Sequence, residues 1–124
     1  MFTRFPQLAD NLARGLCVSN AVIDGEIVVL NDRGEPQFRE LRSRRHDAVF
    51  FAFDLLKLDG RDLRKLPLIE RKRILAELVP DPKSGARMSY VPHIEQHGTG
   101  FFRVICDRDL ERIVAKWVKV KNPK

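Results

Sequence analysis

Two stretches of this sequence decide the fold: Ile23-Asp24-Gly25-Glu26-Ile27-Val28-Val29-Leu30 and Val49-Phe50-Phe51-Ala52-Phe53-Asp54-Leu55-Leu56. Both are short and almost wholly apolar, with the β-branched and aromatic residues that favour buried strands. Each nevertheless carries carboxylates, at Asp24 and Glu26 in the first stretch and at Asp54 in the second. An ionised group is costly to bury without a partner. The pattern therefore predicts two strands in which each carboxylate has a defined task.

Strand periodicity assigns these side chains to faces. Successive side chains point to opposite faces of a sheet. Asp24 and Glu26 therefore share one face of the first strand, while Phe53 and Asp54 fall on opposite faces of the second. Two interpretations of the carboxylates stay open. They hold an arginine or a loop amide as structural partners, or they belong to an active site, where perturbed charges also gather.

The rest of the chain predicts helices around these strands. Leu8, Leu12 and Leu16 recur at helical spacing behind Pro6, which suits the first turn of a helix. The expected elements are a helix over 6–16, strands over 21–30 and 49–56, a helix over 67–79, a short strand at 90–91, a helix over 99–108 and a last strand over 113–121. Turn sequences stand at 31–34 and 58–61. The expected fold class is α+β, with a mostly antiparallel sheet flanked by helices.

The helix that begins at Pro67 is expected to be amphipathic. Its residues Leu68, Leu75 and Leu78 recur at spacings that place them toward the core. The basic run 71–73 is expected to point mostly outward, as charged side chains on the free face of a helix do.

Length and charge limit the possible functions. The chain has 124 residues, enough for one small domain with a single core. Its net charge of +6 favours a polyanionic partner, such as nucleic acid, whose binding weakens with salt. No apolar run approaches the roughly 20 residues of a membrane span, so no membrane partner is expected. Cys17 and Cys106 stand alone, without metal-ligand spacing, which fits a reducing, cytoplasmic location.

Four motifs occur in order along the chain. They are Asp24-Gly25-Glu26-Ile27-Val28, Phe50-Phe51-Ala52-Phe53-Asp54-Leu55-Leu56, Leu110-Glu111-Arg112-Ile113-Val114-Ala115-Lys116 and Trp117-Val118-Lys119-Val120-Lys121. With flanking stretches such as Pro92-His93-Ile94-Glu95, they closely resemble the adenylation domain of ATP-dependent DNA ligases, in particular the bacterial ligases of non-homologous end joining. The resemblance implies a partial ATP-grasp-like nucleotidyltransferase fold, ATP and Mg²⁺ as cofactors, and nicked or broken duplex DNA as partner.

The resemblance also implies a role for residues in each motif. The implied ligands are Glu26 for the ribose hydroxyls, Phe53 for the adenine, Lys119 and Lys121 for the α-phosphate, Lys116 as a further nucleotide-binding residue, and Glu111 for Mg²⁺. Strand periodicity places Lys119 and Lys121 on the face of Trp117 and Lys116 on the opposite face. Other tasks stay open, because lysines on an edge strand also prevent aggregation and a buried phenylalanine also fills a core.

The family nucleophile is a lysine in a Lys-x-Asp-Gly-x-Arg motif upstream of the Asp-Gly-Glu strand. The first lysine of this chain is Lys57, which lies downstream of that strand. Lys57-Leu58-Asp59-Gly60 matches the first letters of the motif, but the arginine comes one position early, at Arg61. We interpret this segment as an ordinary Leu-Asp-Gly turn and Lys57 as a decoy. The expectation is that the nucleophile segment and the C-terminal oligonucleotide-binding (OB) domain are both absent.

The last two motifs depart from the family pattern. Arg112 stands where the family has a glycine after the metal-binding glutamate. The two motifs also abut, whereas the family separates them by a loop. On one continuous strand of about 3.3 Å per residue, Glu111 and Lys121 would lie roughly 30 Å apart. A sharp bend near Trp117 would be needed for both to reach one triphosphate.

These observations define the functional hypothesis. Residues 1–124 form a single partial ligase adenylation domain whose family role is the ATP-driven joining of DNA breaks, and which does not self-adenylate alone. Three other functions stay open. They are a non-catalytic nucleotide- or DNA-binding module, a subunit of a split ligase completed by a partner polypeptide, and an inactive remnant.

Overall fold

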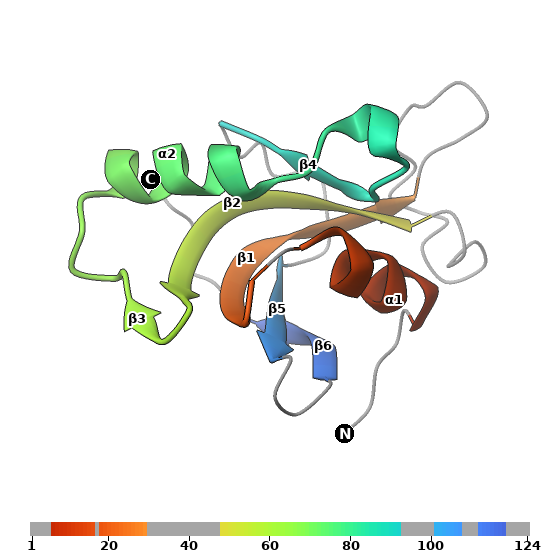
Figure 1. The fold of residues 1–124 in the computed structure, drawn as a ribbon, viewed down its shortest axis with the longest axis horizontal. Helices are drawn as coiled ribbons and strands as arrows, with labels where there is room; N and C mark the ends of the chain where they lie inside the picture. Colours follow the sequence, from red (N-terminus) through yellow and green to blue (C-terminus); the bar gives the residue numbers. More distant parts are fainter. Residues whose placement is uncertain (1–5, 17, 30–47, 93–100, 108–111, 119–124) are drawn as a thin grey trace.

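The computed structural model describes residues 6–16, 18–29, 48–92, 101–107 and 112–118 (Figure 1). The elements are, in chain order, α1 (Pro6–Gly15), β1 (Asn20–Val29), β2 (Ala48–Leu58), β3 (Arg61–Asp62), α2 (Leu68–Leu78), the 3₁₀ helix η3 (Pro82–Ser84), β4 (Met88–Tyr90), β5 (Phe101–Asp107) and β6 (Arg112–Val118). None of the helices within these ranges is long and apolar enough to span a bilayer.

The six strands of the described residues form one sheet in the order β3-β2-β1-β5-β6, with β4 paired to β2. The β2–β4 pair is parallel, and the other pairs are antiparallel. The predicted α+β class with a mostly antiparallel sheet is confirmed. The turn expected at 58–61 is also confirmed, because Asp59 and Gly60 adopt left-handed φ angles of 48° and 84° between β2 and β3. The turn expected at 31–34 lies outside the described residues.

Both helices contribute to a core on one face of the sheet, hereafter the helix side. Leu8, Leu12 and Leu16 are at most 3% exposed, so the helix predicted from their spacing is confirmed. They join one apolar cluster with residues of α2 and the sheet, including Ile23, Ile27, Phe50, Ala52, Leu55, Leu75, Met88, Phe102 and Val104. In Figure 1, α2 runs alongside β2, which it contacts, and α1 contacts β2 and β6.

Helix α2 follows Pro67 as predicted, but its side chains are distributed differently. Leu75 is fully buried, whereas Leu68 is 48% exposed, so the inward placement of Leu68 is wrong. Arg71 and Lys72 of the basic run are half-buried rather than outward. Each reaches a polar atom of β2, and that interaction offsets the loss of hydration at the charged group.

The helix expected over 99–108 is wrong where the structure describes it. Residues Phe101–Asp107 form β5, which pairs with β1 on one side and β6 on the other. The physical reason is a period-2 pattern, because Phe102, Val104 and Cys106 are buried while Arg103 and Ile105 between them are less so. The last strand, expected over 113–121, is observed as β6, and positions 119–121 lie outside the described residues.

Candidate functional site

The face of the sheet opposite the apolar cluster carries the two carboxylates of β1 and is called here the carboxylate face. On β1, Ile23 and Ile27 belong to the helix-side cluster, so the alternating positions Asp24 and Glu26 lie on the opposite face. Their exposed fractions are 6% and 8%. The structure therefore agrees with the prediction that these two carboxylates share a face, and it buries both of them.

An irregularity in the β1–β2 pairing changes the faces expected for β2. Asp24 pairs with Asp54 and the next residue, Gly25, pairs with Ala52, so Phe53 is an extra residue on β2. A β-bulge of this kind interrupts the alternation of side chains. Asp54 lies across from Asp24, and Phe53 is buried outside the described cluster that contains Ala52. The opposite faces predicted for Phe53 and Asp54 assumed unbroken alternation, which does not hold here.

Gly25 is a glycine for a packing reason. A Cβ built on Gly25 would lie 2.3 Å from the carbonyl oxygen of Phe51 and 2.5 Å from Cζ of Phe50. Strand β2 therefore packs directly against the backbone between Asp24 and Glu26, which only a residue without a side chain permits. This close approach fixes where the two carboxylates leave the sheet.

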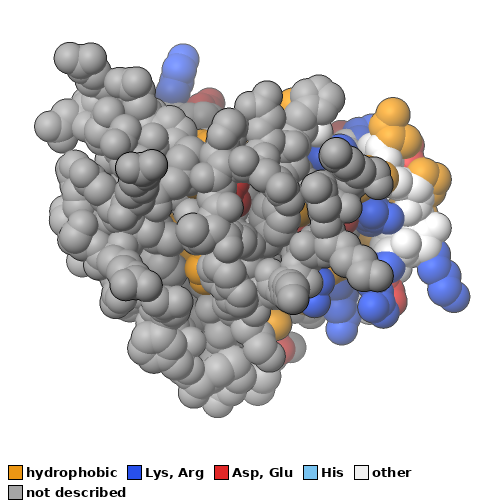
Figure 2. Space-filling view, turned by 180° about the vertical axis from the view of Figure 1, so that it is seen from behind, with side chains coloured by type: hydrophobic (Ala, Val, Ile, Leu, Met, Phe, Trp, Pro, Cys, Tyr) orange, Lys and Arg blue, Asp and Glu red, His pale blue; other side chains and the backbone are white. Residues whose placement is uncertain are grey.

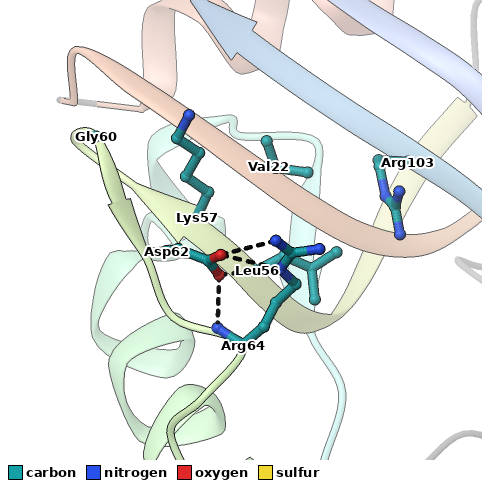
Figure 3. Close-up of a pocket in the computed structure, with 7 residues that line it drawn as sticks. All are labelled: Val22, Leu56, Lys57, Gly60, Asp62, Arg64 and Arg103. Carbon is teal, nitrogen blue, oxygen red and sulfur yellow. Dashed lines mark hydrogen bonds and ion pairs between the residues drawn. The ribbon is translucent and has the colours of Figure 1, made fainter.

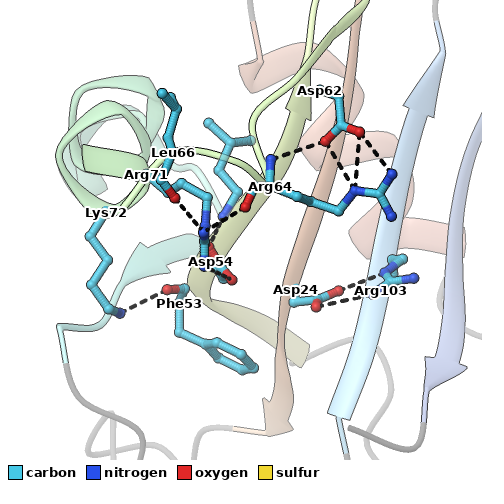
Figure 4. Close-up of polar contacts among 10 residues, drawn as sticks. Asp24, Phe53, Asp54, Asp62, Arg64, Leu66, Arg71, Lys72 and Arg103 are labelled. Atoms are coloured by element: carbon cyan, nitrogen blue, oxygen red, sulfur yellow. Dashed lines mark hydrogen bonds and ion pairs between the residues drawn. The ribbon is translucent and has the colours of Figure 1, made fainter. Parts of the chain in front are cut away.

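Asp24 is held by an arginine from β5. The Nε and Nη2 atoms of Arg103 donate to the two carboxylate oxygens of Asp24 at 2.8 and 3.2 Å (Figure 4). This fork matches the geometry of a carboxylate. The hydrogen bond to Asp24 is the main cause of a raised pKa of Arg103. Because Arg103 is the register partner of Asp24 across β1 and β5, strand pairing itself brings the two charges together.

Asp54 is held in the same way from α2. Arg71 donates from Nε to Oδ1 at 2.9 Å and from Nη2 to Oδ2 at 3.3 Å, and the Leu55 backbone N–H donates to Oδ1 at 2.8 Å. The side chains of Arg71 and Asp54 are only 16% and 17% exposed. For Asp24 and Asp54, the geometry supports the interpretation as structural ion pairs.

The backbone of Phe53 is bound by a lysine of α2. Phe53 is 5% exposed, and its carbonyl oxygen accepts a hydrogen bond from Nζ of Lys72 at 2.8 Å. The same Nζ lies 5.8 Å from the centroid of the Tyr90 ring, within the range of a cation–π contact. Burial is the main cause of a lowered pKa of Lys72. Its ammonium thus binds the backbone of β2 and helps to hold the strand at the bulge.

Lys57 lies at the far end of β2 from Phe53. It is exposed and pairs in register with Val22 of β1 and Asp62 of β3. Lys57 is four positions along the strand from Phe53, a distance of about 13 Å. In the turn that follows, the Asp59 carboxylate accepts hydrogen bonds from the backbone N–H groups of Ser19 and Asn20 at 2.7 and 3.3 Å. Asp59 and Gly60, the Asp-Gly pair of the motif match, therefore have a structural role in this turn.

The remaining candidates belong to β6 or to segments outside the described residues. Lys116 pairs in register with Arg103, so one row crosses four strands through Asp54, Asp24, Arg103 and Lys116. Trp117 pairs with Phe102, a residue of the helix-side cluster. The backbone of β6 thus places the position of Lys116, rather than that of Trp117, on the row of Asp24. Glu111, Lys119 and Lys121 lie outside the described residues.

Sequence reasoning missed the arginines that neutralise the aspartates. Arg103 could have been found from the alternation of its neighbours, which predicts a strand with Arg103 on its polar side. Arg71 carried no such signal, because its spacing on the helix is that of a solvated face. Within the described ranges, no group of three or more metal-ligand side chains converges on one point.

Comparisons with known proteins give a consistent result. Residues 1–121 match the family described as ATP dependent DNA ligase domain. The chain is 29% identical over 128 residues to the SPbeta prophage-derived DNA ligase-like protein LigB of Bacillus subtilis, which covers 98% of this chain and 44% of that protein. It is 34% identical over 119 residues to a probable DNA ligase of Saccharopolyspora erythraea, covering 90% of this chain and 22% of that protein.

Solved structures show the same similarity. The ligase domain of LigD from M. tuberculosis superposes with a TM-score of 0.51 at 29% identity, over 93% of this chain and 42% of that one. A mycobacterial DNA ligase D complexed with ATP and MES gives a TM-score of 0.50 with the same identity and coverage. The chain spans less than half the length of each of these relatives.

Proposed function

The chain belongs to the family of ATP-dependent DNA ligase domains, and from this premise we propose that its carboxylate face binds the nucleotide of an adenylation reaction that serves DNA joining. In this proposal Glu26 accepts hydrogen bonds from the ribose hydroxyls and Phe53 stacks on the adenine. Lys116, in the row of Asp24, neutralises phosphate charge that develops as the α-phosphate is attacked, and Lys119 and Lys121 join it through a bend of the chain near Trp117. The chain supplies nucleotide recognition, and Lys57 is not the nucleophile.

The observation that carries the proposal is the construction of β1 around Gly25. Strand β2 packs against Gly25 so closely that Asp24 and Glu26 are held in fixed positions on the carboxylate face. Asp24 is neutralised by Arg103, so its charge is already used inside the protein. Glu26 lies two positions further along β1 on the same face, and Phe53 is the extra residue of β2 between the partners of Asp24 and Gly25.

Access to these residues is part of the proposal. Glu26 and Phe53 are 8% and 5% exposed, so in this proposal their surroundings rearrange before a nucleotide reaches them. Closure of this face around a bound nucleotide would exclude water, and the exclusion of water strengthens electrostatic interactions with the phosphates.

Mg²⁺ fits the proposal only through residues outside the described ranges. Glu111 is the proposed ligand, by its place in the family motif. When bound, the ion would supply positive charge at the phosphate oxygens. Asp24 and Asp54 are less suited to this task, because an arginine already occupies each carboxylate.

The test is nucleotide binding with and without covalent transfer. We expect the chain to bind ATP with Mg²⁺, and Glu26→Gln to weaken binding at least tenfold while the unfolding transition stays cooperative. Asp107→Asn on β5 is the matched control. Unaltered ATP affinity in Glu26→Gln would contradict the proposed site. A covalent AMP label on the chain that disappears in Lys57→Ala would contradict the assignment of Lys57.

A second candidate function follows from the position of Lys57. Because Lys57 lies about 13 Å from Phe53 along the strand, we also propose that the attacking lysine can be supplied by a partner polypeptide. Adenylation that appears only after a polypeptide with a Lys-x-Asp-Gly-x-Arg motif is added would support this split arrangement. Adenylation of the chain alone would exclude the need for such a partner.

A further inference from the structure

A pocket lies on the carboxylate face at the end of the sheet where β2 turns into β3. Its volume is about 310 Å³, near the lower end of the range for ligand pockets. The residues that line it and matter here, together called the hairpin pocket, are Val22, Lys57, Gly60, Asp62, Arg64 and Arg103 (Figure 3). Lys57, Gly60, Asp62 and Arg64 are exposed, so the pocket opens to solvent.

Three cations from three parts of the fold line the hairpin pocket. Lys57 comes from β2, Arg64 from the segment after β3 and Arg103 from β5. Arg64 and Arg103 line the same pocket, and the charge of Arg64 opposes the rise in the pKa of Arg103 that Asp24 causes. Like charges that face one open cavity favour an anion between them.

Asp62 and Asp24 occupy only some of the N–H donors of Arg64 and Arg103. Asp62 is bound by Nε and Nη2 of Arg64, at 3.0 and 2.7 Å, and Asp24 is bound by the same two atoms of Arg103. The Nη1 group of each arginine makes no hydrogen bond within the part of the chain that the structure describes. The Lys57 ammonium likewise makes neither a hydrogen bond nor an ion pair there.

The hairpin that carries two of these cations is fixed to the start of β1. The Asp59 carboxylate accepts from the backbone of Ser19 and Asn20, and the Asn20 side-chain oxygen accepts from the Gly60 N–H at 2.8 Å. A site on a tied hairpin loses little conformational entropy when a ligand binds. A side chain at position 60 would meet nothing within 4 Å, so the turn is also open to a large partner.

More basic side chains are adjacent in sequence. Arg61 precedes Asp62 and Lys65 follows Arg64, and both are exposed. In Figure 2, lysine and arginine side chains gather on the right, the side where β3 and α2 lie. A small anion the size of one phosphate would contact only the pocket. A polyanion would contact the pocket and the exposed basic side chains near it.

We propose that the hairpin pocket binds a backbone phosphate of DNA, and that Lys57 is a phosphate ligand. The proposal deepens the proposed function by naming a DNA contact, and it depends on that function for the identity of the polyanion. The pocket lies at Val22, four residues along β1 from Glu26, or about 13 Å. Nucleotide recognition and DNA contact would thus use separate ends of the same strand.

The experiment measures how the affinity for nicked duplex DNA depends on salt. Each phosphate contact contributes about −0.9 to the slope of log K against log salt concentration. We expect Lys57→Gln/Arg64→Gln to remove this one phosphate contact and reduce the magnitude of the slope by roughly 0.9, with a smaller reduction for Lys57→Gln alone. The control Lys83→Gln/Arg73→Gln also removes one lysine and one arginine that is paired with a carboxylate, and it should leave the slope unchanged.

ATP affinity measured on the same variants separates this proposal from the previous one. The pocket variants should bind ATP as the unaltered chain does, and Glu26→Gln should keep the full DNA slope. The proposal is overturned if the unaltered chain does not bind nicked DNA, if the pocket variants keep its slope, or if the control loses as much slope. It is also overturned if the pocket variants lose ATP affinity instead, because the phosphate would then be that of the nucleotide. If the double variant fails to unfold cooperatively, Lys57→Gln alone decides.

Discussion

The helix side and the carboxylate face of this sheet are built from the same strands but follow different rules. On the helix side, Ile23, Phe50 and Leu55 are apolar and fully buried against α1 and α2. On the carboxylate face, Asp24, Glu26 and Arg103 put charged groups on neighbouring positions. The helix side is held by apolar contacts, which many combinations of side chains can make. The carboxylate face is held by ion pairs, which require a particular acid opposite a particular base.

The difference indicates a division of labour within one small domain. Apolar burial supplies most of the stability, since it is proportional to the area removed from water. The charged face adds less stability, because the loss of hydration offsets much of the attraction between paired charges. This division can be tested by comparing substitutions on the two faces.

The largest effect should come from the helix side. Phe50→Ala removes a fully buried ring and should lower the free energy of unfolding by about 3–5 kcal/mol. Urea unfolding followed by circular dichroism measures it. Ile69→Ala, at a side chain that is 77% exposed, is the control and should change stability by less than about 0.5 kcal/mol. Comparable losses in both variants would show that the helix side is not the core.

The contact between the strands at Gly25 should give the next effect. Gly25→Ala forces a Cβ to within 2.3 Å of the Phe51 carbonyl oxygen, so the strands must separate. We expect a loss of about 3 kcal/mol, at the upper end for overpacking. Because the shift moves Glu26, ATP affinity should fall at the same time. A variant with unchanged stability and affinity would refute the role assigned to this glycine.

The ion pairs should give a smaller effect that depends on burial. A double-mutant cycle with Asp54→Asn and Arg71→Gln should give a coupling energy of about 1–2 kcal/mol, because both groups are mostly buried. The exposed pair of Asp62 and Arg64 is the matched control, and its coupling should be smaller. Equal coupling in the two cycles would mean that burial does not distinguish them.

The smallest effect concerns pH and Lys72. Burial lowers the pKa of Lys72 below its ordinary value of 10.5, so the unfolded chain binds its proton more tightly than the folded chain does. The charged form therefore opposes folding at neutral pH, and this opposition is relieved as pH rises through the lowered pKa toward 10.5. Relative to Lys72→Gln, the unaltered chain should gain stability in that alkaline window. A loss of stability relative to Lys72→Gln in the same alkaline range would contradict a lowered pKa of Lys72.

Much of the fold was predictable because its signals are local. The spacing of Leu8, Leu12 and Leu16 predicts α1, and the left-handed angles of Asp59 and Gly60 fit the predicted turn. The helix predicted over 99–108 is wrong, although the sequence of this segment also carries a local signal, the alternation typical of a strand. The alternation of buried residues in β5 matches a strand, and pairing with β1 and β6 satisfies its backbone hydrogen bonds.

The candidate site was less predictable than the fold. The motif letters pointed to Glu26 and Phe53, but the face of Phe53 depended on a bulge in the β1–β2 pairing. No periodicity rule contains that extra residue, because it arises from the register of two strands. Lys57 matches a motif letter in the sequence, but its position in a cationic pocket depends on the three-dimensional arrangement.

The sequence by itself determined the two strands, the first helix, the turn after β2 and the family, because each rests on the order and spacing of neighbouring residues. The tertiary structure decided which charge neutralises which. Asp24 and Arg103 are 79 positions apart, and Asp54 and Arg71 come from a strand and a helix. Such pairs form only after register and helix packing are set by the whole core, so no local pattern can specify them.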